Sequence, residues 1–401
     1  MPSCFPALLN LIVLSASLAA GSPADSPKPM GAAWSSPEIG ADGKVTFRYL
    51  APGAKQVMLS PDFDGQPHAM AKDNGLWSVT VGPLQPDIYT YAFQVDGITS
   101  LDPRNANTKY QYGIFGAVSV FEVPGSAPQF YDAKPVPHGM VSILPYQSKS
   151  MGLARTVWVY TPPGYAQGKD FPVLYLLHGA GDVESGWTMI GRANLILDNL
   201  IASGEAKPMV VVMPLGHAIQ SWWTGPAQSA PDPIAKAFQS GKGADIFAAM
   251  YSGDGKGGLS PFAKDLLEDV MPLVEGSYKV AKSPDSRAIA GLSMGGGQSI
   301  HLAFSRPELF RYVVLMSPAA DGRVDLAYPA FFANAAAANQ RFKLLWLGAA
   351  KQDVITGPGD LAFDSLLTRR GIKHTFVLGE GRHEWTVWRH NLRDVAKILF
   401  R

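Results

Sequence analysis

The sequence predicts a small all-β sandwich followed by a larger α/β domain with a mostly parallel central sheet. Three observations support this prediction. Residues 32–123 contain short alternating segments separated by turn dipeptides, and residues 139–401 contain compact apolar runs separated by segments of helical period. The 401-residue chain is also 47% hydrophobic and 17% charged, which is enough apolar material for two full cores.

Residues 1–20 predict an export signal. The apolar run Leu8 to Ala20 ends in the small residues Ser17-Leu18-Ala19-Ala20 and is too short to span a bilayer. The alternative is a buried N-terminal helix. Residues 21–31 are rich in Ser, Pro and Ala and predict a flexible leader. We therefore expect a secreted or periplasmic protein with no membrane attachment once the signal is cleaved.

Charge and cysteine content exclude several classes of function. The chain has 34 Lys and Arg against 33 Asp and Glu, so it has no broad positive field that would attract nucleic acid. Its only cysteine, Cys4, lies in the predicted signal. The exported chain would then have no disulfide, no thiolate metal ligand and no cysteine nucleophile.

In residues 32–123 the apolar side chains alternate as they do in strands with one buried face. One predicted face carries Val45, Phe47 and Tyr49, another carries Tyr89, Tyr91, Phe93 and Val95, and the turns are Asp42-Gly43, Asp64-Gly65, Asn74-Gly75 and Asp96-Gly97. With Leu76-Trp77-Ser78-Val79-Thr80 and Asp102-Pro103, this region resembles the glycogen-binding, isoamylase N-terminal type of immunoglobulin-like module. Such modules bind carbohydrate or merely flank carbohydrate-active domains, and Trp34 and Trp77 are either sugar platforms or core residues.

A Pro-rich segment, residues 124–138, is interpreted as the linker to the larger domain. The predicted buried strands are 173–177, 210–213, 288–290, 313–316, 344–347 and 375–378, and the predicted helices are 193–202, 262–275, 298–304, 361–370 and 385–400. Alternating strands and helices predict a parallel sheet covered on both faces. The leading segments 140–145 and 155–160 predict an antiparallel edge.

The strongest motif in the chain is Gly291-Leu292-Ser293-Met294-Gly295. An apolar strand precedes it and a helix-forming segment follows it, as in the nucleophile turn of α/β-hydrolases. The turn strains the serine backbone, and the flanking glycines remove Cβ atoms that would collide. The sequence therefore predicts Ser293 as a nucleophile at the C-terminal edge of the sheet. The alternative is a glycine-rich turn without chemistry.

A serine nucleophile needs an imidazole to take its proton and a carboxylate to orient that imidazole. In this fold class the acid and then the histidine follow the serine in the chain. His383 follows the strand 375–378 through a short loop, and Asp353 follows the strand 344–347 in the same way. We predict these two as the base and the acid, with Asp360 and Asp364 as competing acids. His301, His374 and His390 are interpreted as packing or surface residues.

The oxyanion hole should combine a backbone N–H after Ser293 with one from an earlier strand end. The segment Leu177-His178-Gly179-Ala180 fits the second role, so the donors are assigned to Ala180 and Met294, and His178 is assigned a structural role. Residues 216–258, with Trp222-Trp223, predict a lid or acyl-pocket wall, or else a passive insertion. Gly179 and Trp223 are the candidate substrate-binding residues.

The larger domain resembles the feruloyl and acetyl-xylan esterases of carbohydrate esterase family 1. The resemblance is carried by Val159-Tyr160-Thr161-Pro162-Pro163-Gly164-Tyr165, Leu177-His178-Gly179, Ala290-Gly291-Leu292-Ser293-Met294-Gly295-Gly296 and His383-Glu384-Trp385. It implies an α/β-hydrolase fold, a Ser293, Asp353 and His383 triad, and no metal or cofactor. Similar motifs occur in enterochelin esterases, which also carry a sandwich domain, and in mycolyl transferases.

These observations together predict a secreted serine esterase that removes feruloyl or acetyl groups from xylan through an acyl-enzyme. The expected partner is an acylated polysaccharide or oligosaccharide. A siderophore esterase is the first alternative, although the loops near Ser293 offer little positive charge besides Arg382 for an anionic ligand. The second alternative is a non-catalytic polysaccharide-binding protein with a dead hydrolase domain.

Overall fold

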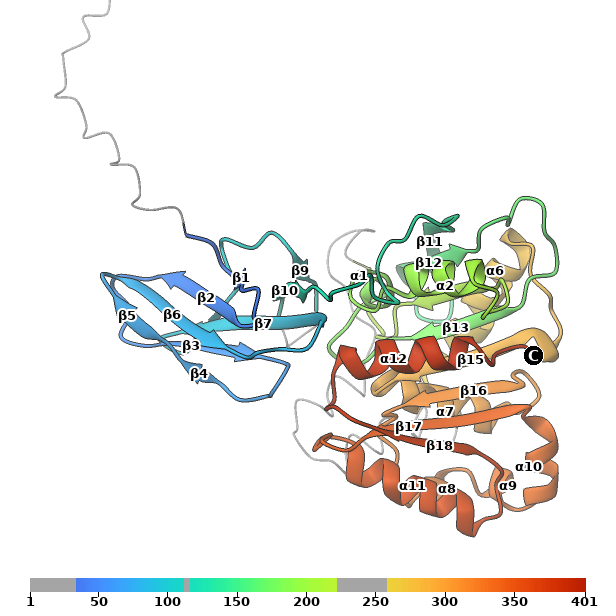
Figure 1. Ribbon diagram of the computed structural model, residues 1–401. Coiled ribbons are helices and arrows are strands. Elements are labelled where there is room, and N and C mark those ends of the chain that lie inside the picture. The colour runs from blue at the N-terminus through green and yellow to red at the C-terminus, as the bar shows by residue number, and fades with distance from the viewer. Residues whose placement is uncertain (1–33, 112–115, 222–257) are drawn as a thin grey trace, which may run out of the picture. The chain divides into compact units, whose positions relative to one another are not determined.

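The computed structural model describes residues 34–111, 116–221 and 258–401 (Figure 1). Residues Ser36–Arg401 form one compact unit. The predicted signal and leader lie outside the described residues, as does Trp223. No helix in the described part of the chain combines the length and the apolar character that crossing a membrane requires.

The N-terminal region folds as two facing antiparallel sheets. One sheet has the order β1 (Glu38–Ile39), β2 (Val45–Leu50), β6 (Leu76–Val81), β5 (Ala71–Asp73). The other has the order β4 (His68–Ala69), β3 (Val57–Pro61), β7 (Asp87–Val95), β10 (Val118–Val123), β9 (Thr108–Lys109), with β8 (Ile98–Ser100) also paired to β7. The two predicted apolar faces, on β2 and β7, meet in a shared core with Leu59 and Phe121.

Two further sequence expectations are resolved in this sandwich. Trp77 is 7% exposed and its Nε1 donates to the carbonyl of Ala51 at 2.9 Å, so it is a core residue and not a sugar platform. Trp34 is half-buried. In the dipeptide Asn74-Gly75 both residues have positive φ, 48° and 86°, as a type I′ hairpin turn requires.

The larger domain is built on an eight-stranded sheet with the order β11-β12-β14-β13-β15-β16-β17-β18. The strands are β11 (Met140–Ser148), β12 (Leu153–Thr161), β13 (Val173–Leu177), β14 (Val210–Pro214), β15 (Arg287–Leu292), β16 (Tyr312–Met316), β17 (Leu344–Ala350) and β18 (Thr375–Gly379). Strands β11 and β12 pair antiparallel and the remaining strands run parallel, which confirms the predicted antiparallel edge. The C-terminal ends of β15, β17 and β18 therefore share one edge of the sheet.

Helices cover both faces of this sheet (Figure 1). One core contains α1 (Gly186–Met189), α2 (Ala193–Ala202) and α12 (Trp385–Ala396). The other contains α5 (Pro261–Lys264), α6 (Met271–Ser277), α7 (Met294–Ser305), α8 (Val324–Ala327), α9 (Pro329–Phe332), α10 (Ala335–Arg341) and α11 (Gly357–Arg369). Strand residues alternate between the two cores, as the pleat dictates.

The segment predicted as one helix over 262–275 departs from that prediction. A π-helical stretch, Asp265–Val270, separates α5 from α6. The apolar residues Phe262, Leu266, Val270 and Val274 are spaced by four, and all are buried. A wider turn keeps this spacing on one face, and π-bulges of this kind commonly occur near functional sites.

The predicted linker also differs from a flexible connection. Residues 124–138 have no helix or strand, but Tyr131 is only 1% exposed. Asn199 of α2 donates to the carbonyls of Phe130 and Asp132, both at 2.9 Å, and the guanidinium of Arg389 lies 5.4 Å from the Tyr131 ring. The buried Tyr131 ring and the two hydrogen bonds from Asn199 anchor the segment, so it packs against the larger domain.

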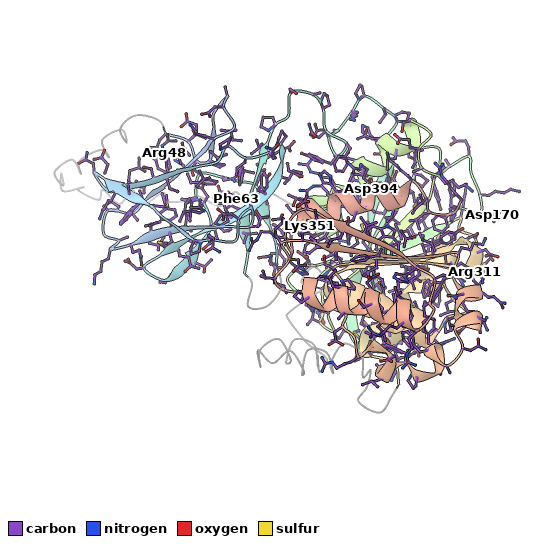
Figure 2. All side chains as sticks on the ribbon, turned by 60° about the horizontal axis from the view of Figure 1, so that its bottom comes forward. Arg48, Phe63, Asp170, Arg311, Lys351 and Asp394 are labelled. Atoms are coloured by element: carbon purple, nitrogen blue, oxygen red, sulfur yellow. The ribbon has the colours of Figure 1, made fainter. Side chains whose placement is uncertain are left out.

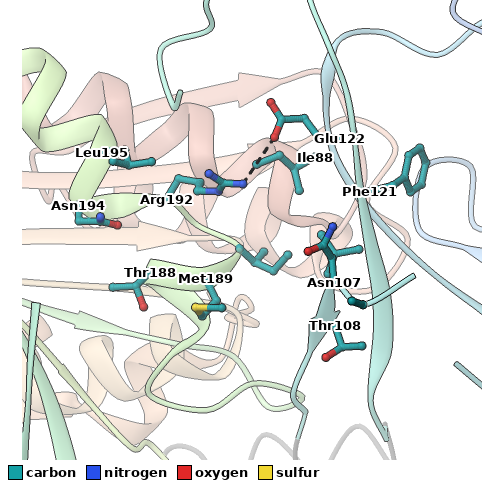
Figure 3. A pocket seen from close by; sticks show the side chains of 13 residues that line it. Ile88, Asn107, Thr108, Phe121, Glu122, Thr188, Met189, Arg192, Asn194 and Leu195 are labelled. Atoms are coloured by element: carbon teal, nitrogen blue, oxygen red, sulfur yellow. Dashed lines mark ion pairs between the residues drawn. The ribbon is translucent and has the colours of Figure 1, made fainter. Parts of the chain in front are cut away.

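Arg389 of α12 also connects the sandwich to the larger domain. Its guanidinium is fully buried and donates to Asp87 Oδ1 at 2.6 Å and to the carbonyls of Ile88 and Ile190 at 2.9 and 2.6 Å. Beside this contact lies a cavity of about 550 Å³ between β7, β10 and α1 (Figure 3). Its lining includes neither Ser293 nor His383.

Candidate active site

Ser293 is the single residue between the end of β15 at Leu292 and the start of α7 at Met294. Its backbone has φ 50° and ψ −119°, a conformation that costs energy for a residue with a side chain. Its N–H donates to the carbonyl of Met316 at 2.9 Å, which ties the turn to the neighbouring strand β16. The serine side chain is thereby placed, partly exposed, above the C-terminal edge of the sheet.

The glycines around Ser293 are required by close packing. A Cβ atom on Gly291 would lie 2.2 Å from the carbonyl oxygen of Gly295, and one on Gly295 would lie 2.5 Å from the carbonyl oxygen of His178. A Cβ atom on Gly296 would lie 2.6 Å from Cα of Pro318. Larger residues at these positions would separate strand, turn and helix, so the motif predicted from the sequence follows from the local geometry.

The structure brings Ser293, His383 and Asp353 into one hydrogen-bonded chain. His383 Nε2 is 2.9 Å from Ser293 Oγ, and His383 Nδ1 is 2.7 Å from Asp353 Oδ2. The indole of Trp388 contacts the imidazole edge-on, with ring centroids 4.9 Å apart. These residues come from three different strand ends, yet the shared sheet edge places them within hydrogen-bonding distance.

This geometry can be set against known families. Residues 148–398 match the family model described as "Putative esterase", and residues 29–110 match carbohydrate-binding module 48, the isoamylase N-terminal domain. The chain belongs to this esterase family. The two resemblances expected from the sequence are thus confirmed.

One relative of the esterase is an endo-1,4-beta-xylanase/feruloyl esterase of Xylanibacter ruminicola. The two are 30% identical over 375 residues, which is 91% of this chain and 46% of that protein. The chain therefore spans about half the length of this relative.

Two solved structures share the fold. A ferulic acid esterase of Anaeromyces mucronatus is 22% identical, with a TM-score of 0.53, covering 68% of this chain and 96% of its own. An enterochelin esterase of Shigella flexneri is 18% identical, with a TM-score of 0.62, covering 89% of this chain and 92% of its own. Both likenesses concern the fold, which is the predicted α/β-hydrolase fold, and the second extends over the sandwich as well.

The Asp353 carboxylate of this esterase is buried but well supplied with donors. Its Oδ1 accepts from the backbone N–H groups of Ile355 and Thr356 at 2.8 and 2.9 Å, and its Oδ2 accepts from the Thr356 hydroxyl at 2.8 Å. Burial alone would raise the pKa of this carboxyl, but the hydrogen bonds from His383 and Thr356 outweigh burial and hold the pKa well below its usual range. Asp353 is therefore an anion at neutral pH, and the imidazole Nδ1–H donates to it.

The two competing acids lie in other environments. Asp364 pairs with His374, whose Nε2 is 2.8 Å from Asp364 Oδ1. Asp360 is fully buried on α11, and burial raises its pKa well above the ordinary value, which favours the neutral acid over the carboxylate. Of the three candidate acids, only Asp353 contacts His383.

The remaining histidines after Ser293 also have partners away from the site. His301 is buried, with Nδ1 at 2.9 Å from the Tyr328 hydroxyl, and desolvation lowers its pKa to about 4. His390 lies 3.3 Å from Asp87 of the sandwich. These positions agree with the packing roles expected from the sequence.

The loop after β13 approaches Ser293 from the other side. A Cβ atom on Gly179 would lie 3.4 Å from Cβ of Ser293. His178 is 1% exposed, its Nδ1–H donates to the Gly179 carbonyl at 2.8 Å, and its Nε2 accepts from the N–H of Gly216 at 2.8 Å. Burial lowers the pKa of His178 to about 3, so the ring stays neutral and acts as a brace for this loop.

The two predicted oxyanion donors occupy suitable places on this frame. Met294 is the first residue of α7, where backbone N–H groups have no partner within the helix. Ala180 follows Gly179 in the bracing loop and is nearly buried. Among the described residues, no group of three or more His, Cys, Asp and Glu side chains is placed to hold a metal ion.

Sequence reasoning missed Arg155 on β12. This fully buried guanidinium donates to the carbonyls of Leu215, His217 and Ile219, the last two at 2.7 and 2.6 Å. It also lies 3.3 Å from the buried Asp265 carboxylate. A charged residue at the start of an otherwise apolar strand was the available signal. Arg155 holds the first residues after β14, which run beside His178.

Replacing Arg155 with methionine is expected to lower the free energy of unfolding by about 3–5 kcal/mol, because Asp265 would keep a buried charge without its cation. Urea unfolding of R155M against the wild type measures the difference. R306M is the matched control, since Arg306 pairs with Glu308 on the surface at 44% and 48% exposure. The control should change stability by less than about 1 kcal/mol. Equal stability of R155M and the wild type would contradict the role of Arg155 in holding the residues after β14.

Proposed function

We propose that this chain is a secreted or periplasmic serine carboxylic-ester hydrolase that removes feruloyl or acetyl groups from plant cell-wall xylan. The observation that supports it best is the uninterrupted hydrogen-bonded chain from Ser293 Oγ through His383 to Asp353. A hydroxyl, a neutral imidazole and an ionised carboxylate in this order are what serine acyl transfer requires. The family of the chain and the names of its relatives agree with this chemistry.

The proposed reaction begins when Ser293 Oγ attacks the ester carbonyl while His383 Nε2 takes the hydroxyl proton. The negative charge on the tetrahedral oxygen is stabilised by the N–H groups of Met294 and Ala180. Asp353 stabilises the imidazolium, which gives its proton to the sugar oxygen as the bond between that oxygen and the acyl carbon breaks, so the sugar leaves as an alcohol. Water attacks the acyl-enzyme with the same base, the carboxylic acid leaves, and Ser293 regains its proton.

Feruloyl and acetyl groups on xylan are proposed as substrates for two reasons. A relative at 30% identity over 91% of this chain is named as a xylanase and feruloyl esterase. The sandwich also belongs to a family of carbohydrate-binding modules. A siderophore esterase is the competing proposal, because the Shigella flexneri enterochelin esterase shares both domains of the fold.

Initial rates on methyl ferulate, acetylated xylan and a catechol trilactone test the substrate proposal. We expect kcat/KM for the ferulate or acetyl ester to exceed that for the trilactone by roughly 100-fold, since sites discriminate through a few kcal/mol of contacts. A preference for the trilactone would replace the proposal with a siderophore esterase. If neither these esters nor 4-nitrophenyl acetate were turned over, the enzyme proposal itself would be wrong.

A further inference from the structure

Lys109 is a sandwich residue whose charged end is buried in the larger domain. It lies on β9, paired with Val118 of β10, and its side chain is only 7% exposed. Lysine is among the residues least often buried, because an ammonium loses much hydration energy unless a partner compensates it. The partner here is the carboxylate of Asp182, which is 5% exposed and forms an ion pair with Lys109.

Asp182 belongs to the loop that faces Ser293. Its N–H donates to the Gly179 carbonyl at 3.1 Å, which closes a tight turn over residues 179–182. One of its carboxylate oxygens would lie 3.5 Å from a Cβ atom on Gly179, the same position that lies 3.4 Å from Cβ of Ser293. The ion pair therefore ends on the last residue of the turn that contains Ala180.

The Lys109 ammonium also contacts one of the tryptophans that pack beside His383. It lies 5.6 Å from the ring centroid of Trp385, the first residue of α12, a distance at which an ammonium is attracted to an aromatic face. Trp385 packs edge-on against Trp388, with centroids 5.6 Å apart, and Trp388 packs edge-on against His383. A single side chain of the sandwich thus contacts both residues 179–182, which we call the oxyanion loop, and Trp385, which packs on the neighbour of the His383 ring.

We propose that Lys109 is a positioning residue for the oxyanion loop, so that the N-terminal sandwich supplies part of the active-site framework. This inference rests on the proposed serine esterase function. Through Asp182, the lysine fixes the turn that carries the Ala180 N–H. A displacement of such a donor by about 1 Å is enough to cost roughly 100-fold in rate. Because the Ala180 N–H stabilises the transition state, its displacement should lower kcat.

The test is a double-mutant cycle on the full chain with 4-nitrophenyl acetate, using K109M, D182N and K109M/D182N. Each single variant should lower kcat by about 10-fold to 100-fold and leave KM within about 2-fold. The double variant should match the more impaired single variant, because Lys109 acts through Asp182. An organophosphate that labels Ser293 counts the competent sites and corrects for unfolded protein. Wild-type kcat in K109M, or effects that multiply in the double variant, would overturn the proposal.

A matched control is the ion pair between Arg192 and Glu122, which joins the two domains at 3.5 Å beside the large cavity (Figure 3). Both side chains are about one third exposed, and neither is among the contacts of Asp182. R192M should keep wild-type kcat. If the single K109M chain did not fold, the neutral double variant would carry the test, and a wild-type kcat there would end the proposal.

Failure of this inference can be told apart from failure of the proposed function. If K109M is unaffected while loss of the Ser293 hydroxyl abolishes turnover, the esterase stands and the role of Lys109 falls. If turnover survives without that hydroxyl, the proposed function falls first, and the inference falls with it.

Discussion

The variant S293A is expected to lose roughly five orders of magnitude in kcat for 4-nitrophenyl acetate, on the pattern of other serine nucleophile knockouts. The hydroxyl that attacks the carbonyl is removed, while the backbone geometry is retained, because the Ser293 N–H still donates to the Met316 carbonyl. Residual turnover above the uncatalysed rate reflects the oxyanion donors and substrate binding alone. Steady-state assays of 4-nitrophenyl acetate hydrolysis with purified protein measure the loss in kcat.

The control for S293A is S305A. Ser305 ends the same helix α7 and is exposed, so its hydroxyl has no part in the site. S305A should keep wild-type kcat, and both variants should melt close to the wild type. Activity of S293A within 10-fold of the wild type would remove the nucleophile assignment and the mechanism built on it.

The sequence predicted the sheet well, and with it the edge where the candidate site residues meet, because local signals there are strong. The strand 173–177 and the helix 193–202 were predicted with the bounds that the structure has. Continuous apolar runs and glycine-rich turns follow directly from burial on both faces of a parallel sheet. Strand order then requires the ends of β15, β17 and β18 to lie together, which is why Ser293, Asp353 and His383 could be assigned from their places after those strands.

Other features could not be predicted because they depend on contacts between distant segments. The Arg155 guanidinium donates to backbone carbonyls only because β12 runs antiparallel to β14, which brings residues 215–219 to its side chain. The buried state of Lys109 depends on how the sandwich meets α12 and the loop after β13. A single charged residue within a polar segment has no periodic pattern that would distinguish it from a solvated one.

The sequence favoured Asp353 as the acid, and the structure adds the physical difference between Asp353 and its two competitors. Asp353, Asp360 and Asp364 lie within one short stretch after β17, and spacing alone left them as competitors. What separates them is the supply of donors, since backbone N–H groups and a hydroxyl converge on Asp353 while burial dominates at Asp360. That difference predicts opposite behaviour for two buried carboxyls seven residues apart.

The variant D353N is expected to lower kcat/KM by roughly 10⁴-fold, as replacing the acid of a serine triad does. An amide at this position can donate to Nδ1, so it favours the imidazole tautomer that has its proton on Nε2 and cannot accept from Ser293. The imidazolium also loses its anion. D360N is the matched control, because Asp353 and not Asp360 contacts His383, and the raised pKa of Asp360 favours the neutral acid that an amide resembles. D360N should keep kcat/KM within a few fold of the wild type.

The same pair should show opposite pH dependence of stability. The pKa of Asp353 is lowered in the fold, so its ionisation stabilises the native state fully above the ordinary value near 3.8, and this stabilisation is lost as the pH falls below 3.8 toward and through the lowered pKa. The pKa of Asp360 is raised, so the native state loses stability as the pH rises from about 3.8 toward the raised pKa. Melting curves from pH 3 to pH 8 should therefore show D353N falling further below the wild type with rising pH, and D360N gaining relative to it. If the two differences ran in the same direction, one of the two pKa shifts would be wrong. If D360N instead abolished turnover while D353N kept it, Asp360 would be the acid.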